Sequence, residues 1–152
     1  MEECCICFHI KPPVLLKPCN HTMCIGCLDN YLRFDIRCHM CRALISGSDP
    51  PLYRPSKKHY KVFIPPARGH VLGVSVMSAN DKLIMTDIDK TGRGYNSGIL
   101  EGDQIIAINT IPCYRIQHIS SLIECEDEVY LYVRRTKPLP LFCCSVLRRK
   151  KL

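Results

Sequence analysis

Residues that can ligate a metal crowd the first 41 positions of the chain and follow a regular spacing. They read CxxC, eleven residues, CxHxxCxxC, ten residues and a final CxxC. A CxxC turn places two thiolates within reach of one ion, and structural zinc takes four such ligands in a tetrahedron. The pattern therefore predicts two closed zinc sites, built from Cys4, Cys7, Cys19, His21, Cys24, Cys27, Cys38 and Cys41. This segment is too short to bury a self-sufficient core, so the two zinc ions must supply much of its folding free energy.

A disulfide framework is the alternative use of these cysteines, and it requires an oxidising compartment. The first residues, MEECCICFHI, open acidic and lack the basic flank and apolar run of a secretory signal. A histidine among regularly spaced cysteines also favours metal over disulfides. No apolar run approaches the length of a membrane-spanning helix. We therefore expect a zinc-binding protein of the cytoplasm.

The order of the ligands, three cysteines, one histidine and four cysteines, resembles the RING finger over residues 1–45. The stretch PPVLLKPCNHTMCIGCLDNYL is similar to the RING segment that runs through the second and third ligand pairs into the central helix. A PHD finger places its histidine later in the ligand order and fits less well. The cross-brace of the RING family implies that one zinc is held by Cys4, Cys7, Cys24 and Cys27. It implies that the second is held by Cys19, His21, Cys38 and Cys41.

The RING resemblance also implies a surface that recruits a ubiquitin-conjugating enzyme. Ile6, Tyr31 and Met40 stand where the family presents its contact residues, Ile6 between the first two ligands and Tyr31 near the usual exposed aromatic. Arg42 follows the last ligand, where active RING proteins often carry a cation that bridges the conjugating enzyme and its ubiquitin. His39 departs from the proline that commonly follows the seventh ligand. The alternative is that Ile6 and Tyr31 only fill a small core.

Composition divides the rest of the chain into three parts. Residues 46–58, SGSDPPLYRPSKK, are rich in Ser, Pro and Lys without apolar periodicity, which predicts a linker. Residues 59–136 contain short β-branched or apolar runs separated by Gly, Asn, Asp and Pro, which predicts strands. Residues 116–125 carry apolar side chains at helical spacing. Residues 137–152 form a basic tail.

The strand order over residues 59–136 resembles a PDZ domain. SGILEGDQIIAIN is similar to the family's Gly-Leu-x-x-Gly-Asp segment. KVFI comes before a turn and the run VLGV, just as the family's first strand comes before its carboxylate-binding loop. EVYLYVRR is similar to the family's closing strand. Val71 replaces the usual first glycine of that loop. We therefore expect an α+β protein, with a zinc-stabilised RING cross-brace followed by a PDZ-like antiparallel β-barrel or sandwich that has one or two short helices.

A peptide groove is the expected site of this second domain. Successive backbone amides in a glycine-containing turn can hold an anion, and an exposed strand edge can accept an extended peptide. We expect the loop at residues 71–74, the edge at residues 74–77, and binding of a target with an apolar C-terminus. The PDZ resemblance implies that His118, if it opens the helix, selects Ser or Thr two residues before the peptide end. The groove residues are Arg68, Val71, Leu72, Gly73, Val74, Val76, His118 and Leu122. The alternatives are a closed or unused groove and a structural His118.

The net charge of +7 belongs mainly to the tail, so the folded domains are not expected to bind a specific nucleic acid. The tail combines Cys143 and Cys144 with a terminal RRKK cluster. S-acylation with polybasic attraction to anionic lipid predicts membrane association, and RRKK alternatively fits a nuclear-import signal. A solvated tail and an extra strand packed on the second domain are the remaining interpretations.

These parts together predict a two-module ubiquitin ligase, similar to the ligand-of-Numb class in having a RING followed by a PDZ. The RING would recruit the conjugating enzyme with its ubiquitin, and the second module would select the target. A RING ligase has no nucleophile of its own, because it holds the thioester-linked ubiquitin in a reactive pose. The alternative is a non-enzymatic adaptor that sequesters partners.

Overall fold

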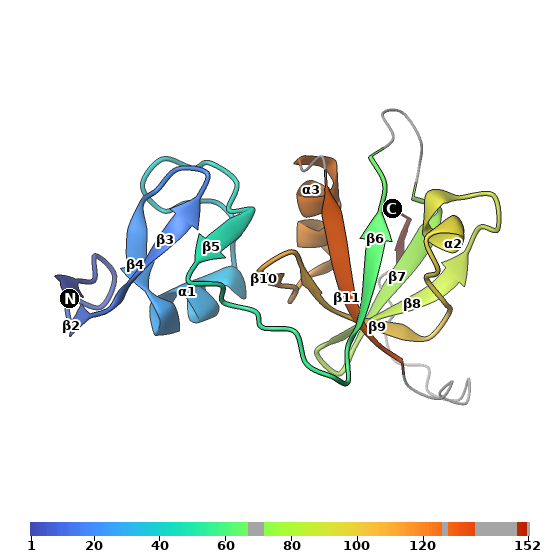
Figure 1. Cartoon of the computed structure of the whole chain (residues 1–152), viewed down its shortest axis with the longest axis horizontal. Helices are drawn as coiled ribbons and strands as arrows, with labels where there is room; N and C mark the ends of the chain where they lie inside the picture. Colours follow the sequence, from blue (N-terminus) through green and yellow to red (C-terminus); the bar gives the residue numbers. More distant parts are fainter. Residues whose placement is uncertain (67–71, 126–127, 136–148, 152) are drawn as a thin grey trace.

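The computed structural model describes residues 1–66, 72–125, 128–135 and 149–151. Two lobes lie next to each other along the longest axis of the molecule (Figure 1). The zinc lobe comprises residues 1–49, and the sheet lobe comprises residues 59–135 together with residues 149–151. Within the described residues, no helix has both the length and the apolar character needed to cross a membrane.

The zinc lobe contains one helix and two small antiparallel sheets. Its elements are β1 (Glu2–Glu3), β2 (Ile10–Lys11), β3 (Pro13–Lys17), β4 (Thr22–Cys24), α1 (Ile25–Leu32) and β5 (Gly47–Asp49). Strand β1 pairs with β2, and β3 lies between β4 and β5. Val14 and Leu16 are buried on one face of β3, while Leu28 and Leu32 are buried one turn apart on α1. These few apolar side chains form a small core, consistent with a lobe that depends on metal.

The segment predicted as a linker, residues 46–58, is partly folded. Strand β5 pairs with β3, which makes Gly47–Asp49 part of the zinc lobe. The backbone amides of Ser48, within β5, and of Tyr53, after it, donate hydrogen bonds to Thr110 of the sheet lobe, at 3.2 and 3.0 Å. Pairing of β5 needs only backbone groups, so a polar, apparently patternless sequence can form it. The linker prediction is therefore wrong for Gly47–Asp49.

The sheet lobe is built on one antiparallel sheet whose order is β12-β7-β8-β9-β11-β6, with β10 paired to β9. Its strands are β6 (Tyr60–Ile64), β7 (Val74–Ala79), β8 (Lys82–Ile88), β9 (Asp103–Ile108), β10 (Ile111–Pro112), β11 (Val129–Arg135) and β12 (Arg149–Lys151). Its helices are α2 (Arg93–Asn96) and α3 (Ile116–Cys125). Two short helices and an antiparallel sheet were expected. Among the described residues, the end strands β12 and β6 do not pair with each other, so the expected barrel is not closed.

Helix α3 packs against β7 and β9 through the apolar stripe that the sequence predicted. Ile116, Ile119 and Leu122 are buried, and Ile123 is partly buried against the same core. The strands contribute most of the remaining apolar side chains of this core, and Ser75 and Asp103 are polar side chains that these strands bury. Helix α3 therefore stands beside the strand that was expected to receive a peptide.

The two lobes are held together by a polar clamp, formed by α1 and the turn before α3. The Tyr114 hydroxyl donates to the Asp29 carboxylate, and Arg115 Nε donates to the Arg33 carbonyl at 2.7 Å. The Arg33 guanidinium lies over the Tyr114 ring, 4.4 Å from its centroid, and Arg115 lies over Phe34 at 5.8 Å. The buried side chains of both lobes form one continuous cluster. The lobes therefore share a core as well as this polar contact.

Candidate zinc centres and partner-binding surfaces

The first zinc ligand set combines the turn before β2 with the start of α1. The thiols of Cys4, Cys7, Cys24 and Cys27 all lie within 4.8 Å of one another. The sulfurs of Cys7 and Cys24 are 3.9 Å apart. Zinc–sulfur bonds of about 2.3 Å in a tetrahedron place two sulfurs about 3.8 Å apart. This cluster therefore has the donors and the spacing that zinc requires.

The second ligand set consists of Cys19, His21, Cys38 and Cys41, whose ligand atoms also lie within 4.8 Å of one another. Nδ1 of His21 is 3.5 Å from the Cys38 sulfur, which identifies Nδ1 as the nitrogen that faces the site. Mixed zinc–nitrogen and zinc–sulfur bonds predict an edge of about 3.5 Å. The two sets alternate along the chain, so the cross-brace pairing predicted from the RING resemblance is present.

In each set, one thiol is prepared to ionise. Burial acts against ionisation of Cys4, but backbone N–H groups of Cys24, Cys7 and Ile6 outweigh it and lower the pKa of Cys4 to about 6. The Cys24 amide lies 3.3 Å from the Cys4 sulfur. Cys38 likewise has its pKa lowered to about 7, against the effect of burial, by the amides of the last CxxC turn. These amides hold thiolates ready for the metal.

The structure and the comparisons identify the zinc lobe. The model of the C3HC4-type zinc finger, or RING finger, matches residues 1–48. Residues 1–48 form a RING finger. The chain is also 46% identical, over 41 residues, to the E3 ubiquitin-protein ligase AIRP2 of Arabidopsis thaliana. That match covers 27% of this chain and 17% of the relative, so the chain spans less than a fifth of the relative's length.

The solved structures include a neighbour of the second lobe. The chain is similar to the second PDZ domain of Dlg1 from the choanoflagellate Monosiga brevicollis, with a TM-score of 0.45 and 14% sequence identity. The match covers 51% of this chain and 99% of that chain.

The residues expected to contact a conjugating enzyme, which we call the recruiting face, are Ile6, Tyr31, Met40 and Arg42. Ile6 and Met40 lie in the first and last CxxC turns and are 42% and 64% exposed. Tyr31 is only partly exposed, because it packs against the core and its hydroxyl donates to the Arg37 carbonyl at 2.7 Å. The structure therefore leaves Ile6, Met40 and Arg42 accessible to a partner, whereas Tyr31 is partly buried.

Asp35 is a residue of the recruiting face that sequence reasoning missed. Its carboxylate lies 2.9 Å from Arg42 Nη1 and accepts a hydrogen bond from the Arg37 amide. Burial acts to raise the pKa of Asp35, but the Arg37 amide and the Arg42 guanidinium lower it, so the carboxylate stays charged. Arg42 Nη1 also lies 3.5 Å from the Tyr31 hydroxyl. Asp35 and Tyr31 therefore orient the Arg42 guanidinium. In the sequence, the one sign of this role is that Asp35 stands seven residues before Arg42.

Cys5 and His39 connect the first and the last CxxC turns. The Cys5 sulfur is 3.0 Å from His39 Nε2 and 3.3 Å from the Thr22 carbonyl. The His39 ring also packs edge-on against Tyr31, with centroids 6.4 Å apart. His39 thus replaces the usual proline by a side chain that joins the turn carrying Ile6 to the turn carrying Met40.

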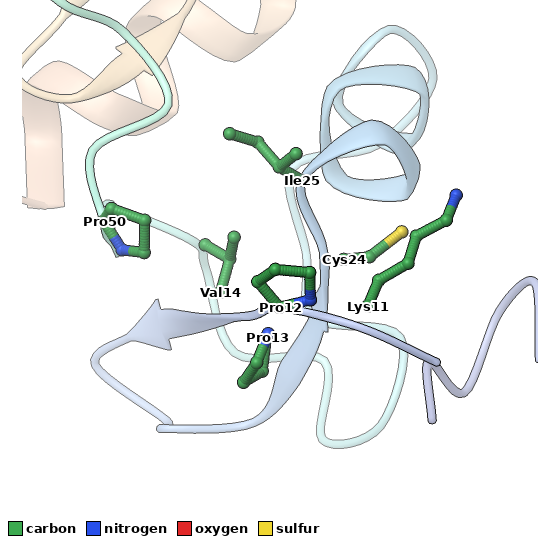
Figure 2. Close-up of a pocket in the computed structure, with 7 residues that line it drawn as sticks. All are labelled: Lys11, Pro12, Pro13, Val14, Cys24, Ile25 and Pro50. Carbon is green, nitrogen blue, oxygen red and sulfur yellow. The ribbon is translucent and has the colours of Figure 1, made fainter. Parts of the chain in front are cut away.

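A shallow apolar hollow lies elsewhere on the zinc lobe (Figure 2). It is lined by Lys11, Pro12, Pro13, Val14, Cys24, Ile25 and Pro50. Figure 2 shows these side chains arising from the β3 region, the start of α1 and the segment after β5. Ile6, Tyr31, Met40 and Arg42 do not line it, so the hollow is separate from the recruiting face.

In the sheet lobe, the expected glycine turn precedes β7. Gly73 has φ +72°, and a Cβ there would lie 3.0 Å from the Gly92 Cα. The Leu72 and Gly73 carbonyls accept hydrogen bonds from the Gly94 and Asp89 amides, at 2.9 and 2.8 Å. Glycine is therefore required at this position by backbone conformation and by close approach. Arg68 and Val71 lie outside the described residues.

The apolar groove residues are brought together, but they are buried. Leu72, Val74, Val76 and Leu122 all belong to the core. His118 is also buried and is the third residue of α3, so it does not open the helix as its selective role required. Burial lowers the pKa of His118, and the Arg115 charge adds to this effect. His118 is therefore a neutral interior histidine, which is the structural alternative.

The strand edge expected to be exposed at residues 74–77 is occupied. Strand β12 pairs antiparallel with β7, with Arg149 opposite Met77, Lys150 opposite Val76 and Lys151 opposite Ser75. The opposite edge of β7 pairs with β8. Of the interpretations of the tail, the extra strand is the one that the structure contains, while Cys143 and Cys144 lie outside the described residues.

Proposed function

We propose that this protein is a RING-type ubiquitin ligase that positions a ubiquitin-conjugating enzyme. The observation that carries the proposal is the recruiting face itself, where Ile6 and Met40 are exposed on two zinc-binding turns joined by the Cys5–His39 contact, and Arg42 is exposed directly after the last ligand. Exposed apolar anchors with a charged residue at the rim are what a protein interface requires. The similarity to a protein named E3 ubiquitin-protein ligase supports the same function.

The zinc ions in this proposal are structural. Each would be held by four protein ligands, which leaves no position for a reacting water. Catalysis then consists of holding the thioester-linked ubiquitin in a reactive pose. Arg42 would contact the conjugating enzyme and ubiquitin together, and Asp35 would fix the direction of its guanidinium.

The test is discharge of ubiquitin from charged conjugating enzymes to a free amine, in the presence of the whole chain. We expect Ile6→Ala to reduce discharge about tenfold or more, because loss of an interface anchor costs about 2 kcal/mol. Leu15→Ala is the matched control, since Leu15 is 40% exposed and lies on β3 of the same lobe. Arg42→Ala should slow discharge more than it weakens binding of the conjugating enzyme. Both variants should retain two zinc ions.

No discharge by the wild-type chain with any conjugating enzyme of a broad panel would refute the ligase function. It would favour the non-enzymatic adaptor, in which the sheet lobe sequesters a partner.

We further propose that the sheet lobe selects the target, by accepting an extended segment with an apolar C-terminus at β7. The turn at Gly73, the neighbouring α3 and the ability of the β7 edge to pair with an added strand support this role. Main-chain pairing would supply affinity, and the amides of the turn would hold the carboxylate. Titration of free-acid and amidated peptide libraries against the whole chain, and against a chain that ends at residue 148 and so lacks β12, tests it. Equal binding of the two libraries to the shorter chain, or no binding to it, would contradict this role.

A further inference from the structure

The β7 edge that a target segment would use is already filled by the chain's own residues 149–151. Strand β12 is an end strand of the sheet, and β7 is the strand with which it pairs. Its three residues pair with Ser75, Val76 and Met77. A target strand and β12 would compete for the same row of backbone groups, because each β-strand has only two edges and β8 takes the other.

The length of the connection allows this pairing within one chain. In the sheet order, β12 lies four strand positions away from β11, the strand that ends at Arg135. Neighbouring strands are about 4.8 Å apart, so the crossing measures about 19 Å across the sheet. Residues 136–148 can span roughly 40 Å when extended. The connector therefore reaches β7 in the same molecule without needing a second copy.

We propose that residues 149–151 are an internal competitor for the β7 edge, so that a target binds only when β12 leaves. The competition with a target rests on the proposed function of the sheet lobe, whereas the β12–β7 contact does not. A tether of this kind gives the competing strand an effective concentration of order millimolar. A three-residue strand is short enough to open, and a longer target segment would displace it.

Hydrogen–deuterium exchange of the β7 amides tests the contact directly. The whole chain should exchange more slowly at residues 74–79 than a chain ending at residue 148, by about threefold or more. Exchange of β9 and β11 should not change, because neither strand touches β12. Equal exchange of residues 74–79 in the two chains would overturn the proposal.

Two proline variants separate backbone pairing from charge. In an antiparallel ladder, alternate residues direct their amides toward the partner strand. Only one of Lys150→Pro and the double variant Arg149→Pro/Lys151→Pro should therefore release β7. The charge-matched controls Lys150→Gln and Arg149→Gln/Lys151→Gln should keep its protection. Equal loss of protection in the glutamine variants would mean that charge holds the tail, which overturns the proposal of strand pairing.

Dilution and a peptide probe complete the experiment. Protection within one chain should be unchanged by tenfold dilution, whereas protection that falls on dilution would place β12 on a second copy and overturn the internal competitor. A labelled peptide of residues 145–152 should bind the chain ending at 148 about threefold or more tightly than the whole chain. If β7 is protected in the whole chain but neither free-acid nor amidated library peptides bind the chain ending at residue 148, the target function fails and the internal contact stands.

Discussion

Tyr114→Phe should weaken the clamp between the two lobes without removing any apolar contact. The hydroxyl that it deletes donates to the Asp29 carboxylate, and the ring remains under the Arg33 guanidinium. A hydrogen bond to a charged group contributes about 1.5–3 kcal/mol. The Asp29 side chain is 37% exposed, so water can partly replace the lost donor. We therefore expect the free energy of unfolding to fall by about 1–2 kcal/mol.

The assay is thermal unfolding of the zinc-loaded whole chain. For a chain of this size, the expected loss lowers Tm by about 3–6 °C. Tyr95→Phe is the control, because Tyr95 is exposed on α2 and its change should stay within about 0.5 kcal/mol. An unchanged Tm for Tyr114→Phe would refute the reasoning. In a double-mutant cycle with Asp29→Ala, the two losses should not add, since both variants delete the same bond.

Alkaline pH provides an independent check of the same residue. Burial, with the hydrogen bond to Asp29 next, raises the pKa of Tyr114 to about 12 from an ordinary value of about 10. The folded state then holds its proton where the unfolded state releases it, so the stability from Tyr114 is complete below pH 10. It is lost as pH rises from about 10 to 12. Tyr114→Phe should remove this part of the alkaline decline in unfolding free energy.

Three further predictions concern the metal, the recruiting face and the glycine turn. Metal analysis should give two zinc ions per chain, and the first site should bind zinc more weakly at pH 6 than at pH 8, because burial raises the pKa of Cys27 to about 12 and its proton must leave. Cys5→Ala should retain zinc and should slow ubiquitin discharge, but less than Ile6→Ala does, because it releases the His39 ring and keeps the Ile6 side chain. Discharge at the rate of the wild-type chain would contradict this prediction. Gly73→Ala should lower the free energy of unfolding by about 2 kcal/mol, measured by denaturant titration, because alanine is strained at φ +72°. Gly98→Ala shares a positive φ but meets open space, so it should cost less.

Local patterns in the sequence were enough to predict the zinc ligands, the longer strands of the sheet lobe and helix α3. The CxxC turns set the spacing of the ligands, and the apolar periodicity of residues 116–125 marked α3 at both ends. The run EVYLYVRR contains the whole of β11. In each case, the structure depends on residues that are close together in the chain.

Contacts between distant residues could not be predicted in the same way. Tyr114 and Asp29 are 85 positions apart, and nothing in the sequence relates one to the other. Strands β5 and β12 join their sheets through backbone groups, which every residue possesses. Gly47–Asp49 therefore resembled a linker, and an extra strand was only one of several open interpretations of the basic tail. The burial of His118 could not be predicted either, because it depends on what packs around α3 and not on where α3 begins.

Under the proposed ligase function, the shared core between the two lobes would help to decide which lysines of a target are modified. If the RING and the β7 edge cannot swing independently, a docked target is held at one distance and one angle from the thioester. Lysines within that zone would be modified whatever residues surround them, and lysines beyond it would be spared. The choice of lysine would then depend on its distance from the thioester. Moving an acceptor lysine along an unstructured target segment should therefore change its modification abruptly.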